Sequence, residues 1–132
     1  LLTCAMQGSD SGNQTLNVYA GCLGETCASP TPGEPADLKC MAQSCWAAAA
    51  SCNGGNPYMT CNDFNSCLAN CANDTQCVNE QCLWNAKASA LLAFLDLIDC
   101  VAAECPDPAD TACSENAQMG ACSGAAQSCL NN

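Results

Sequence analysis

Cysteine is the residue that most constrains this chain, because sixteen of its 132 residues are cysteine and the count is even. A domain of this length is small for a core that stabilises itself, and cysteine at this density is typical of a disulfide scaffold. Disulfides persist outside reducing compartments. We therefore expect an exported protein, at a cell surface or in the extracellular medium. The cysteines expected to be oxidised are Cys4, Cys22, Cys27, Cys40, Cys45, Cys52, Cys61, Cys67, Cys71, Cys77, Cys82, Cys100, Cys105, Cys113, Cys122 and Cys129.

Two features bear on export and on membranes. The sequence begins with Leu1 rather than an initiator methionine, so we expect that a targeting segment has been removed. The main apolar run covers residues 88–95 and is interrupted by Asp96 and Asp99. A helix that spans a bilayer needs about 20 apolar residues. We therefore predict no transmembrane segment.

The charge of the chain limits its partners. Thirteen carboxylates are balanced only by Lys39 and Lys87, and without arginine or histidine the formal net charge is −11. Nucleic acids are bound through cationic side chains that contact phosphates. We therefore expect no nucleic-acid partner, and the sequence leaves the ligand unknown.

The distribution of glycine and proline indicates an all-α fold. Neither residue occurs from Tyr58 to Cys105, and alanine, leucine, glutamine and asparagine are abundant. We expect a helix over residues 14–27 and a second from about Glu34 to the turn at residues 53–55. A third helix is predicted after Thr60, where Asp63 completes a capping-box pattern. A single long helix is predicted from Thr75 to Cys105.

An internal repeat organises the chain as one domain over residues 1–132. Residues 34–40 resemble residues 107–113, and two cysteines with the same spacing follow each segment. The repeat units span residues 20–52 and 98–129, and a looser copy covers residues 61–89. Each unit is predicted to be a helical hairpin with disulfide staples, and the hairpins surround the long central helix.

Antiparallel hairpins favour nested cysteine pairs, which gives a hypothesis for the connectivity. The proposed pairs are Cys27–Cys40, Cys22–Cys45, Cys71–Cys77, Cys67–Cys82, Cys105–Cys113 and Cys100–Cys122. This scheme leaves Cys4, Cys52, Cys61 and Cys129 without an assigned partner. A five-residue step turns about 140° around an α-helix, so the Cys-x4-Cys pairs fit only if the helix frays or tightens there.

The sequence offers little material for catalysis or metal binding. It has no Cys-x2-Cys motif and no histidine, which removes the usual zinc, haem-attachment and thiol-redox patterns. Asp96, Asp99 and Glu104 form the only acidic cluster on an expected helix, and a solvated helix face explains them. Asp107 and Asp110 are interpreted as helix caps rather than as calcium ligands. We assign no catalytic, cofactor-binding or metal-binding residue and expect a protein that is not an enzyme.

Two apolar seams run along the predicted long helix. Trp84, Ala88, Leu91, Leu95, Ile98, Ala102 and Cys105 follow a heptad spacing, and a second seam contains Leu83, Ala90, Phe94, Leu97 and Val101. One explanation is a central helix packed inside its own domain. The other is that one seam faces another copy of the protein. The second explanation predicts an assembly interface that includes at least part of Leu83, Leu91, Leu92, Phe94, Leu97 and Val101.

Two cysteine motifs carry a resemblance to a known group. The motifs are Cys67-Leu-Ala-Asn-Cys71-Ala-Asn-Asp74-Thr-Gln-Cys77 and Cys105-Pro-Asp-Pro-Ala-Asp110-Thr-Ala-Cys113. They resemble the cysteine-rich repeats of exported proteins from myxobacteria and their delta-proteobacterial relatives, and the resemblance covers most of residues 20–129. It implies a cell-surface or extracellular protein and supplies no catalytic residues.

These observations lead to one functional expectation and one alternative. We expect a non-enzymatic extracellular structural protein that forms a homo-oligomer or polymer in a fibre, sheath or surface layer. The alternative is a secreted binding module, such as an effector, a toxin or a carrier of a small apolar ligand. A cavity between the hairpins favours binding, whereas a flat apolar stripe on the surface favours assembly.

Overall fold

The computed structural model describes residues 10–27 and 37–132, and within them the chain folds into helices with no β-strand. The prediction of an all-α fold is confirmed. One isolated bridge joins Met59 to Ala86. The α-helices are α2 (Asp10–Gly21), α3 (Leu38–Ser44), α4 (Trp46–Cys52), α5 (Cys61–Cys71), α6 (Thr75–Cys77), α7 (Ala88–Glu104), α8 (Thr111–Met119) and α9 (Ser123–Asn131). Three short elements join them: two π-helical turns, η1 (Cys22–Thr26) and η2 (Val78–Cys82), and a 3₁₀ turn, η3 (Leu83–Asn85).

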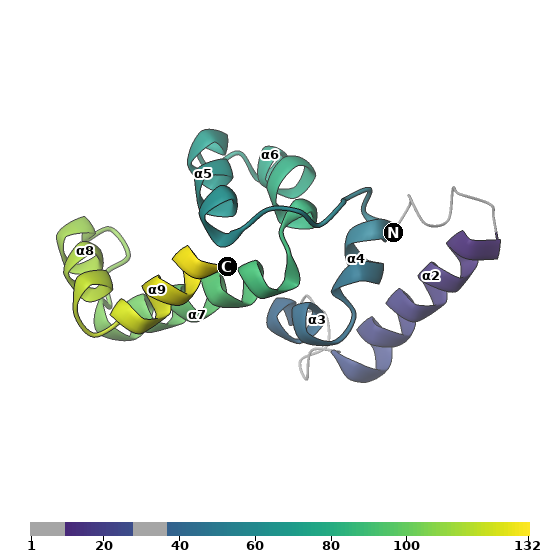
Figure 1. Ribbon diagram of the computed structural model, residues 1–132, viewed down its shortest axis with the longest axis horizontal. Helices are drawn as coiled ribbons and strands as arrows, with labels where there is room; N and C mark the ends of the chain where they lie inside the picture. Colours follow the sequence, from purple (N-terminus) through teal and green to yellow (C-terminus); the bar gives the residue numbers. More distant parts are fainter. Residues whose placement is uncertain (1–9, 28–36) are drawn as a thin grey trace.

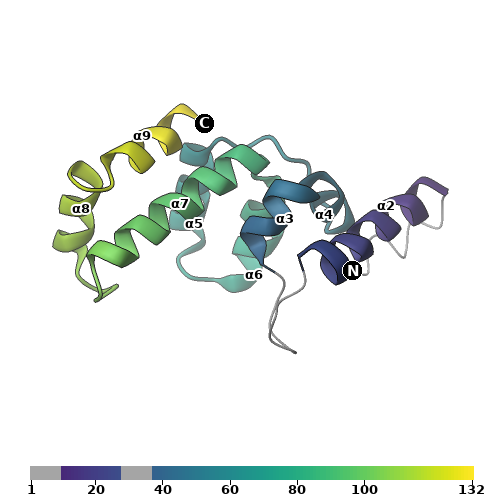
Figure 2. The same cartoon turned by 90° about the horizontal axis from the view of Figure 1, so that it is seen from below.

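The molecule is elongated, and α2 and α8 lie at its opposite ends (Figure 1). Helix α7 occupies the middle, where it packs against α3, α5, α8 and α9. Helix α9 returns antiparallel along α7, as the turned view shows (Figure 2). The chain therefore ends beside the start of α5, where the amide of Cys61 donates a hydrogen bond to the carbonyl oxygen of Asn132 at 3.3 Å.

Three helical hairpins carry nested disulfides. In the first hairpin, α2 to α4, the pairs are Cys22–Cys45 and Cys27–Cys40. In the second, α5 to η2, they are Cys67–Cys82 and Cys71–Cys77. In the third, α7 to α9, they are Cys100–Cys122 and Cys105–Cys113. These six pairs are the nested pairs expected from the sequence.

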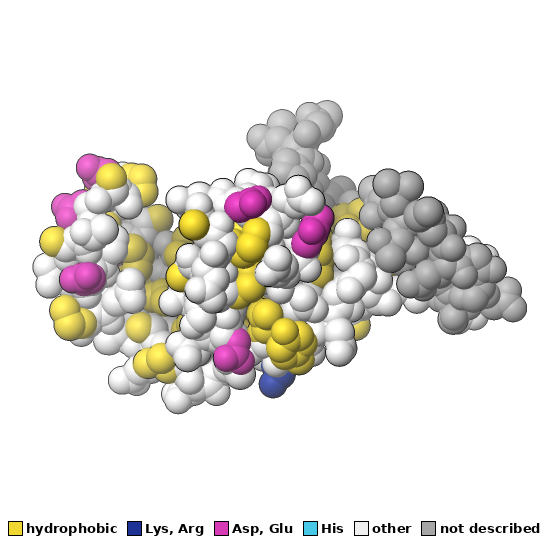
Figure 3. Space-filling view, turned by 90° about the horizontal axis from the view of Figure 1, so that it is seen from above, with side chains coloured by type: hydrophobic (Ala, Val, Ile, Leu, Met, Phe, Trp, Pro, Cys, Tyr) yellow, Lys and Arg dark blue, Asp and Glu magenta, His cyan; other side chains and the backbone are white. Residues whose placement is uncertain are grey.

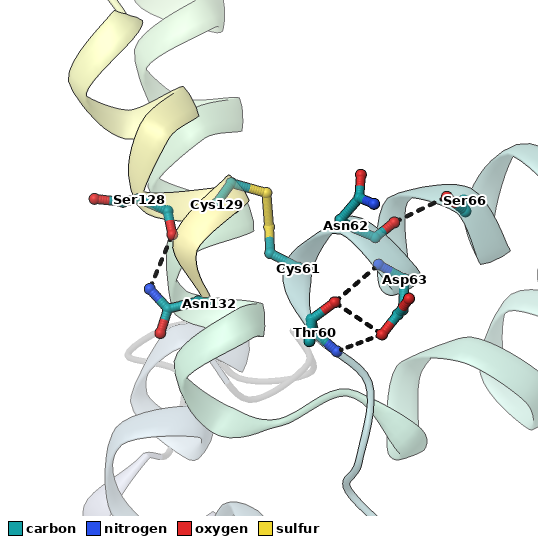
Figure 4. The surroundings of a disulfide bond; sticks show 8 residues. All are labelled: Thr60, Cys61, Asn62, Asp63, Ser66, Ser128, Cys129 and Asn132. Atoms are coloured by element: carbon teal, nitrogen blue, oxygen red, sulfur yellow. Dashed lines mark hydrogen bonds between the residues drawn. A yellow bond between two sulfur atoms is a disulfide. The ribbon is translucent and has the colours of Figure 1, made fainter.

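A seventh disulfide joins two of the cysteines that the sequence left unassigned. Cys129 on α9 is bonded to Cys61 at the first turn of α5, beside the capping box of Thr60 and Asp63 (Figure 4). Cys52 is also disulfide-bonded, and Cys4 lies outside the described residues. The Cys61–Cys129 bond connects the second hairpin to the third.

Two of the three Cys-x4-Cys segments differ from the expectation that the helix frays or tightens. Cys22–Thr26 and Val78–Cys82 widen into π-helical turns, and the amide of Cys27 donates to the carbonyl oxygen of Cys22 at 2.7 Å. A π-turn closes a bond over five residues, so residues five apart come to the same side of the helix. In the third hairpin the helix ends at Glu104 instead, and Cys105 is extended.

The expected helix from Thr75 to Cys105 is wrong, because the chain breaks at Ala86 and Lys87. Both residues have extended backbone angles, and the amide of Lys87 donates to the carbonyl oxygen of Met59 at 3.0 Å. The indole nitrogen of Trp46 donates to the carbonyl oxygen of Ala86 at 2.7 Å. A side chain at Gly55 would collide with the backbone of Trp84, so glycine allows the segment before Met59 to cross here. Tertiary contacts therefore override helical propensity at this point.

The second expected helix also differs from the structure. Asp37 accepts a hydrogen bond from the amide of Lys39 and caps a helix that begins at Leu38. The expected start at Glu34 lies outside the described residues. The helix is interrupted at Cys45, whose backbone leaves the helical region at φ −150°. This break turns α4 so that it packs against α2.

The buried residues form one large cluster and two small ones. The large cluster draws most of its residues from the first two hairpins. It includes Tyr19, Met41, Trp46 and Phe64, together with Leu91 of α7. The small clusters lie along α7 and contain only alanine and cysteine as fully buried residues. The third hairpin therefore depends on its disulfides more than the first does.

A candidate apolar groove at the end of α7

The residues of the predicted assembly interface pack mainly inside the chain. Leu91 is 1 % exposed and belongs to the large core, which corrects its assignment to an interface. Phe94 meets the ring of Phe64 edge-on, with 5.1 Å between ring centroids. The other predicted residues are partly buried against the three clusters: Leu83, Leu92, Leu97 and Val101. The two seams of α7 are therefore covered largely by the chain's own helices.

The acidic residues near the middle of α7 form a surface ion pair. The ammonium group of Lys39 on α3 lies 2.5 Å from a carboxylate oxygen of Asp96 and 3.6 Å from one of Asp99. The hydrogen bond to Asp96 raises the pKa of Lys39 above its usual value of 10.5. Both carboxylates are exposed, and the ion pair joins α3 to α7 at the surface.

The two aspartates after α7 accept hydrogen bonds from nearby backbone amides. Asp107 accepts a hydrogen bond from the amide of Ala109, and Asp110 accepts one from the amide of Cys113, each at 2.9 Å. Asp110 is the N-cap of α8. The interpretation as a helix cap is therefore confirmed for Asp110, whereas Asp107 stabilises the turn before α8.

Three sulfur atoms in the second hairpin lie close enough together to hold a metal ion. They belong to Cys67, Cys71 and Cys82, within 4.8 Å of one another. All three cysteines are engaged in the Cys67–Cys82 and Cys71–Cys77 disulfides. A metal is bound by thiolates, and a disulfide has none to offer. In this structure the cluster is therefore a pair of adjacent disulfides.

An apolar groove lies where α7 ends and α8 begins. Its volume is about 400 Å³, and it is lined by Ile98, Val101, Ala102, Cys105, Pro106, Pro108 and Ser114. Ile98 is 47 % exposed, although it occupies a seam position of α7. The groove is therefore the part of the α7 seams that the chain's own helices leave open.

The groove has covalently fixed walls. Cys105 at its floor is bonded to Cys113 on α8, and one turn earlier Cys100 is bonded to Cys122 at the start of α9. The loop between α7 and α8 contains Pro106 and Pro108, whose rings restrict the backbone. A site held in this way loses little conformational entropy when a ligand binds.

The local sequence explains why the groove is open. A residue before proline is disfavoured in the helical region, and Cys105 precedes Pro106. Its backbone is extended, with φ −123° and ψ 92°, so α7 stops and the loop swings away from the helix. Sequence reasoning missed this groove, although the Cys105-Pro106 pair carried the signal for the end of the helix.

A second, shallower groove of about 440 Å³ lies between α2 and α4. It is lined by Gln14, Thr15, Val18, Ala47, Ala48 and Ser51. Half of these side chains are polar, and the others except Val18 are alanine. The groove at the end of α7 is the better candidate for an apolar ligand, because Ser114 is the one polar residue among its seven lining residues.

Comparison with family models, with curated proteins and with solved structures found no match to this chain. Among the described helices, none is both long enough and apolar enough to cross a membrane. The disulfide-bonded helical scaffold is consistent with an oxidising, extracellular location.

Proposed function

We propose that this protein is a secreted, non-enzymatic binding module whose ligand enters the groove at the end of α7. The observation that carries the proposal is an apolar groove of about 400 Å³ on a scaffold stapled on both sides of it. Small-molecule and peptide sites are concave and mostly apolar, and their volumes begin at about 300 Å³. We also propose that the protein is released outside the cell and that it catalyses no reaction.

Other helices of the same chain bury most of the α7 seams, which favours a binding function over assembly through the predicted interface. A long exposed apolar stripe is expected of a helix that packs against another copy. Leu91 is buried, and Phe94 is held against Phe64 within the chain. The exposed remainder of the seams, at Ile98 and Ala102, lines a groove rather than a flat stripe.

The test uses a neutral apolar dye, Nile red, whose fluorescence rises in an apolar environment. We expect the wild-type protein to enhance the fluorescence and Ile98→Asp to weaken dye binding by at least about tenfold, because the charged side chain removes apolar contact area from the groove. Ile98 is about half exposed, so the new carboxylate keeps its water and the fold is retained. Circular dichroism checks that helicity is unchanged.

Val18→Asp is the matched control, because Val18 is 58 % exposed and lies in the second groove at the opposite end of the molecule. Dye binding that survives Val18→Asp and is lost in Ile98→Asp supports the proposal. Equal binding by wild type and Ile98→Asp contradicts it.

A second candidate function is a self-assembling structural subunit, for which the ends of the molecule are the supporting observation. Val18 is exposed on α2, and Met119 is 75 % exposed on α8. Helices α2 and α8 lie at opposite ends (Figure 1). Contact between unlike ends repeats without closing and gives a filament.

Light scattering over a range of protein concentrations tests this second candidate. Assembly through the ends predicts growth of the particle with concentration, and Met119→Asp should abolish it without loss of helicity. A wild-type protein that stays monomeric at high concentration and neutral pH contradicts the structural role.

A further inference from the structure

Negative charge surrounds the groove and positive charge is absent from the third hairpin. From Leu97 to Asn132 the sequence has five carboxylates and no lysine or arginine. The five are Asp99, Glu104, Asp107, Asp110 and Glu115, and all are exposed. In the space-filling view, acidic side chains gather around the α8 end of the molecule with hydrophobic atoms between them (Figure 3).

These carboxylates flank the lining residues on each element of the groove. On α7, Glu104 borders one side of the apolar stripe that contains Ile98 and Val101. Asp99 borders the other side, where it is already paired with Lys39. Asp107 lies between the lining prolines Pro106 and Pro108, and Glu115 follows the lining Ser114. The groove therefore has an apolar floor and an acidic margin.

We propose that this groove binds a cationic amphipathic segment of another polypeptide. The apolar side chains of the segment enter the groove, and its lysine or arginine side chains pair with Glu104, Asp107 and Glu115 at the margin. This inference rests on the groove-binding function proposed above and names the class of ligand. The attraction between margin and segment also accelerates their encounter, and it weakens as salt screens the charges.

A second copy of this chain does not fit the same description. It has only two lysines, and Lys39 is already paired with Asp96 and Asp99. With a net charge of −11 on each copy, a contact between two acidic margins is repulsive. The charge of the groove therefore selects a foreign, basic partner.

The probe is a fluorescein-labelled amphipathic helical peptide built only of leucine and lysine. Its affinity is measured by fluorescence anisotropy at low salt and again as salt is raised. Two further peptides separate the two parts of the proposal: one has glutamate in place of lysine, and the other has serine in place of leucine. We expect the leucine–lysine peptide to bind far more tightly than either, and its affinity to fall with salt.

Two matched double variants distinguish the effect of the carboxylates at the groove margin from the effect of the overall net charge. Glu104→Gln with Asp107→Asn neutralises two groove carboxylates, and asparagine keeps the oxygen that Asp107 offers to the amide of Ala109. Glu25→Gln with Glu80→Gln changes the net charge equally, on the η1 and η2 turns away from the groove. We expect the groove variant to weaken peptide binding by about three- to tenfold and the distant variant to leave it unchanged.

Several results would overturn this inference. Equal effects of the two double variants would mean that only the net charge acts. Equal binding of the glutamate and lysine peptides would remove the role of charge. If Nile red binds in the groove and the leucine–lysine peptide does not, the ligand class is wrong and the binding function stands. If neither binds, both proposals fail.

Discussion

The first and third hairpins carry the same pattern of staples but end their leading helices differently. Their outer disulfides span 23 and 22 residues, Cys22–Cys45 and Cys100–Cys122, and each inner disulfide begins five residues further on. In the first hairpin the helix passes into a π-turn between its two cysteines. In the third the helix stops at Glu104 and the chain turns away.

A single difference after the second cysteine explains these two outcomes. Cys27 is followed by alanine, whereas Cys105 is followed by Pro106. Proline disfavours a helical conformation for the residue before it. In the first hairpin the helix continues as a π-turn, which brings Cys22 and Cys27 to the same side of the helix, with their sulfur atoms 3.7 Å apart. Stopping at Cys105 leaves the last turn of α7 open and creates the groove.

The largest expected effect tests the large core, to which the first hairpin contributes more buried residues than the third. Trp46 is 4 % exposed, stacks on Trp84 with 5.3 Å between ring centroids, and donates a hydrogen bond to Ala86. We expect Trp46→Ala to lower the free energy of unfolding by about 3–5 kcal/mol. Chemical denaturation followed by circular dichroism measures the change.

Val101→Ala is the matched variant in the third hairpin, where Val101 packs only partly against a small cluster. Val101→Ala is expected to lower the free energy of unfolding by about 1 kcal/mol or less, because it removes about two methylene equivalents from a partly buried site. Similar losses in the two variants would contradict the contrast between the two cores.

The second prediction concerns the outer staples, whose loops are matched in length. Replacing either disulfide with a pair of alanines should lower the free energy of unfolding by about 3 kcal/mol in the chain-entropy model. The two losses should be similar, because the loops are nearly equal in length. We expect the third hairpin to lose protection from amide hydrogen exchange when Cys100 and Cys122 are replaced. The first hairpin should keep protection when Cys22 and Cys45 are replaced, because Tyr19, Met41 and Trp46 still pack there. Equal protection in both variants would show that the apolar core adds nothing.

The third prediction removes the cause of the difference. Pro106→Ala allows Cys105 to remain helical, so α7 is expected to continue toward a π-turn and to narrow the groove. Nile red binding should fall, and stability should change by no more than about 1 kcal/mol, since the substitution acts mainly on the entropy of the unfolded chain. Unchanged dye binding together with unchanged helicity would show that Pro106 does not set the end of the helix.

The smallest effect concerns the ion pair that joins the two regions. The pKa of Lys39 is raised in the folded protein, so its pairing with Asp96 stabilises the fold below the unfolded-state pKa near 10.5 and is lost as the pH rises through the folded value. Thermal unfolding should show a slight loss of stability above that pH. Lys39→Gln should remove this dependence, and a dependence that persists in the variant would assign it to another group.

The sequence predicts the staples well because their logic is local. Nested pairing follows from antiparallel hairpins, and the pairs Cys27–Cys40 and Cys105–Cys113 each close one loop. The capping box at Thr60 is equally local and is present in the structure. What the sequence could not predict depends on distant contacts. The break at Ala86 needs the crossing segment at Met59 and the indole of Trp46, which are far away in sequence.

The groove at the end of α7 could not be predicted from the sequence for a similar reason. The seam residues of α7 form one continuous pattern in the sequence, and nothing in that pattern distinguishes Leu91 from Ile98. Only the packing of the other helices decides that Leu91 is buried and Ile98 is about half exposed. The open part of the apolar pattern lies at the last turns of α7, beyond most of the residues of the predicted interface.

The most direct test of the account is a nuclear magnetic resonance titration of the labelled wild-type protein with Nile red. The account predicts that amide shifts change first at Ile98, Val101, Ala102 and Ser114, around the groove between the third hairpin's staples. The amides around Val18, in the groove between α2 and α4, should stay unchanged. Shifts that cluster around Val18, or no localised shifts at all, would contradict the claim that the end of α7 is a preformed binding site.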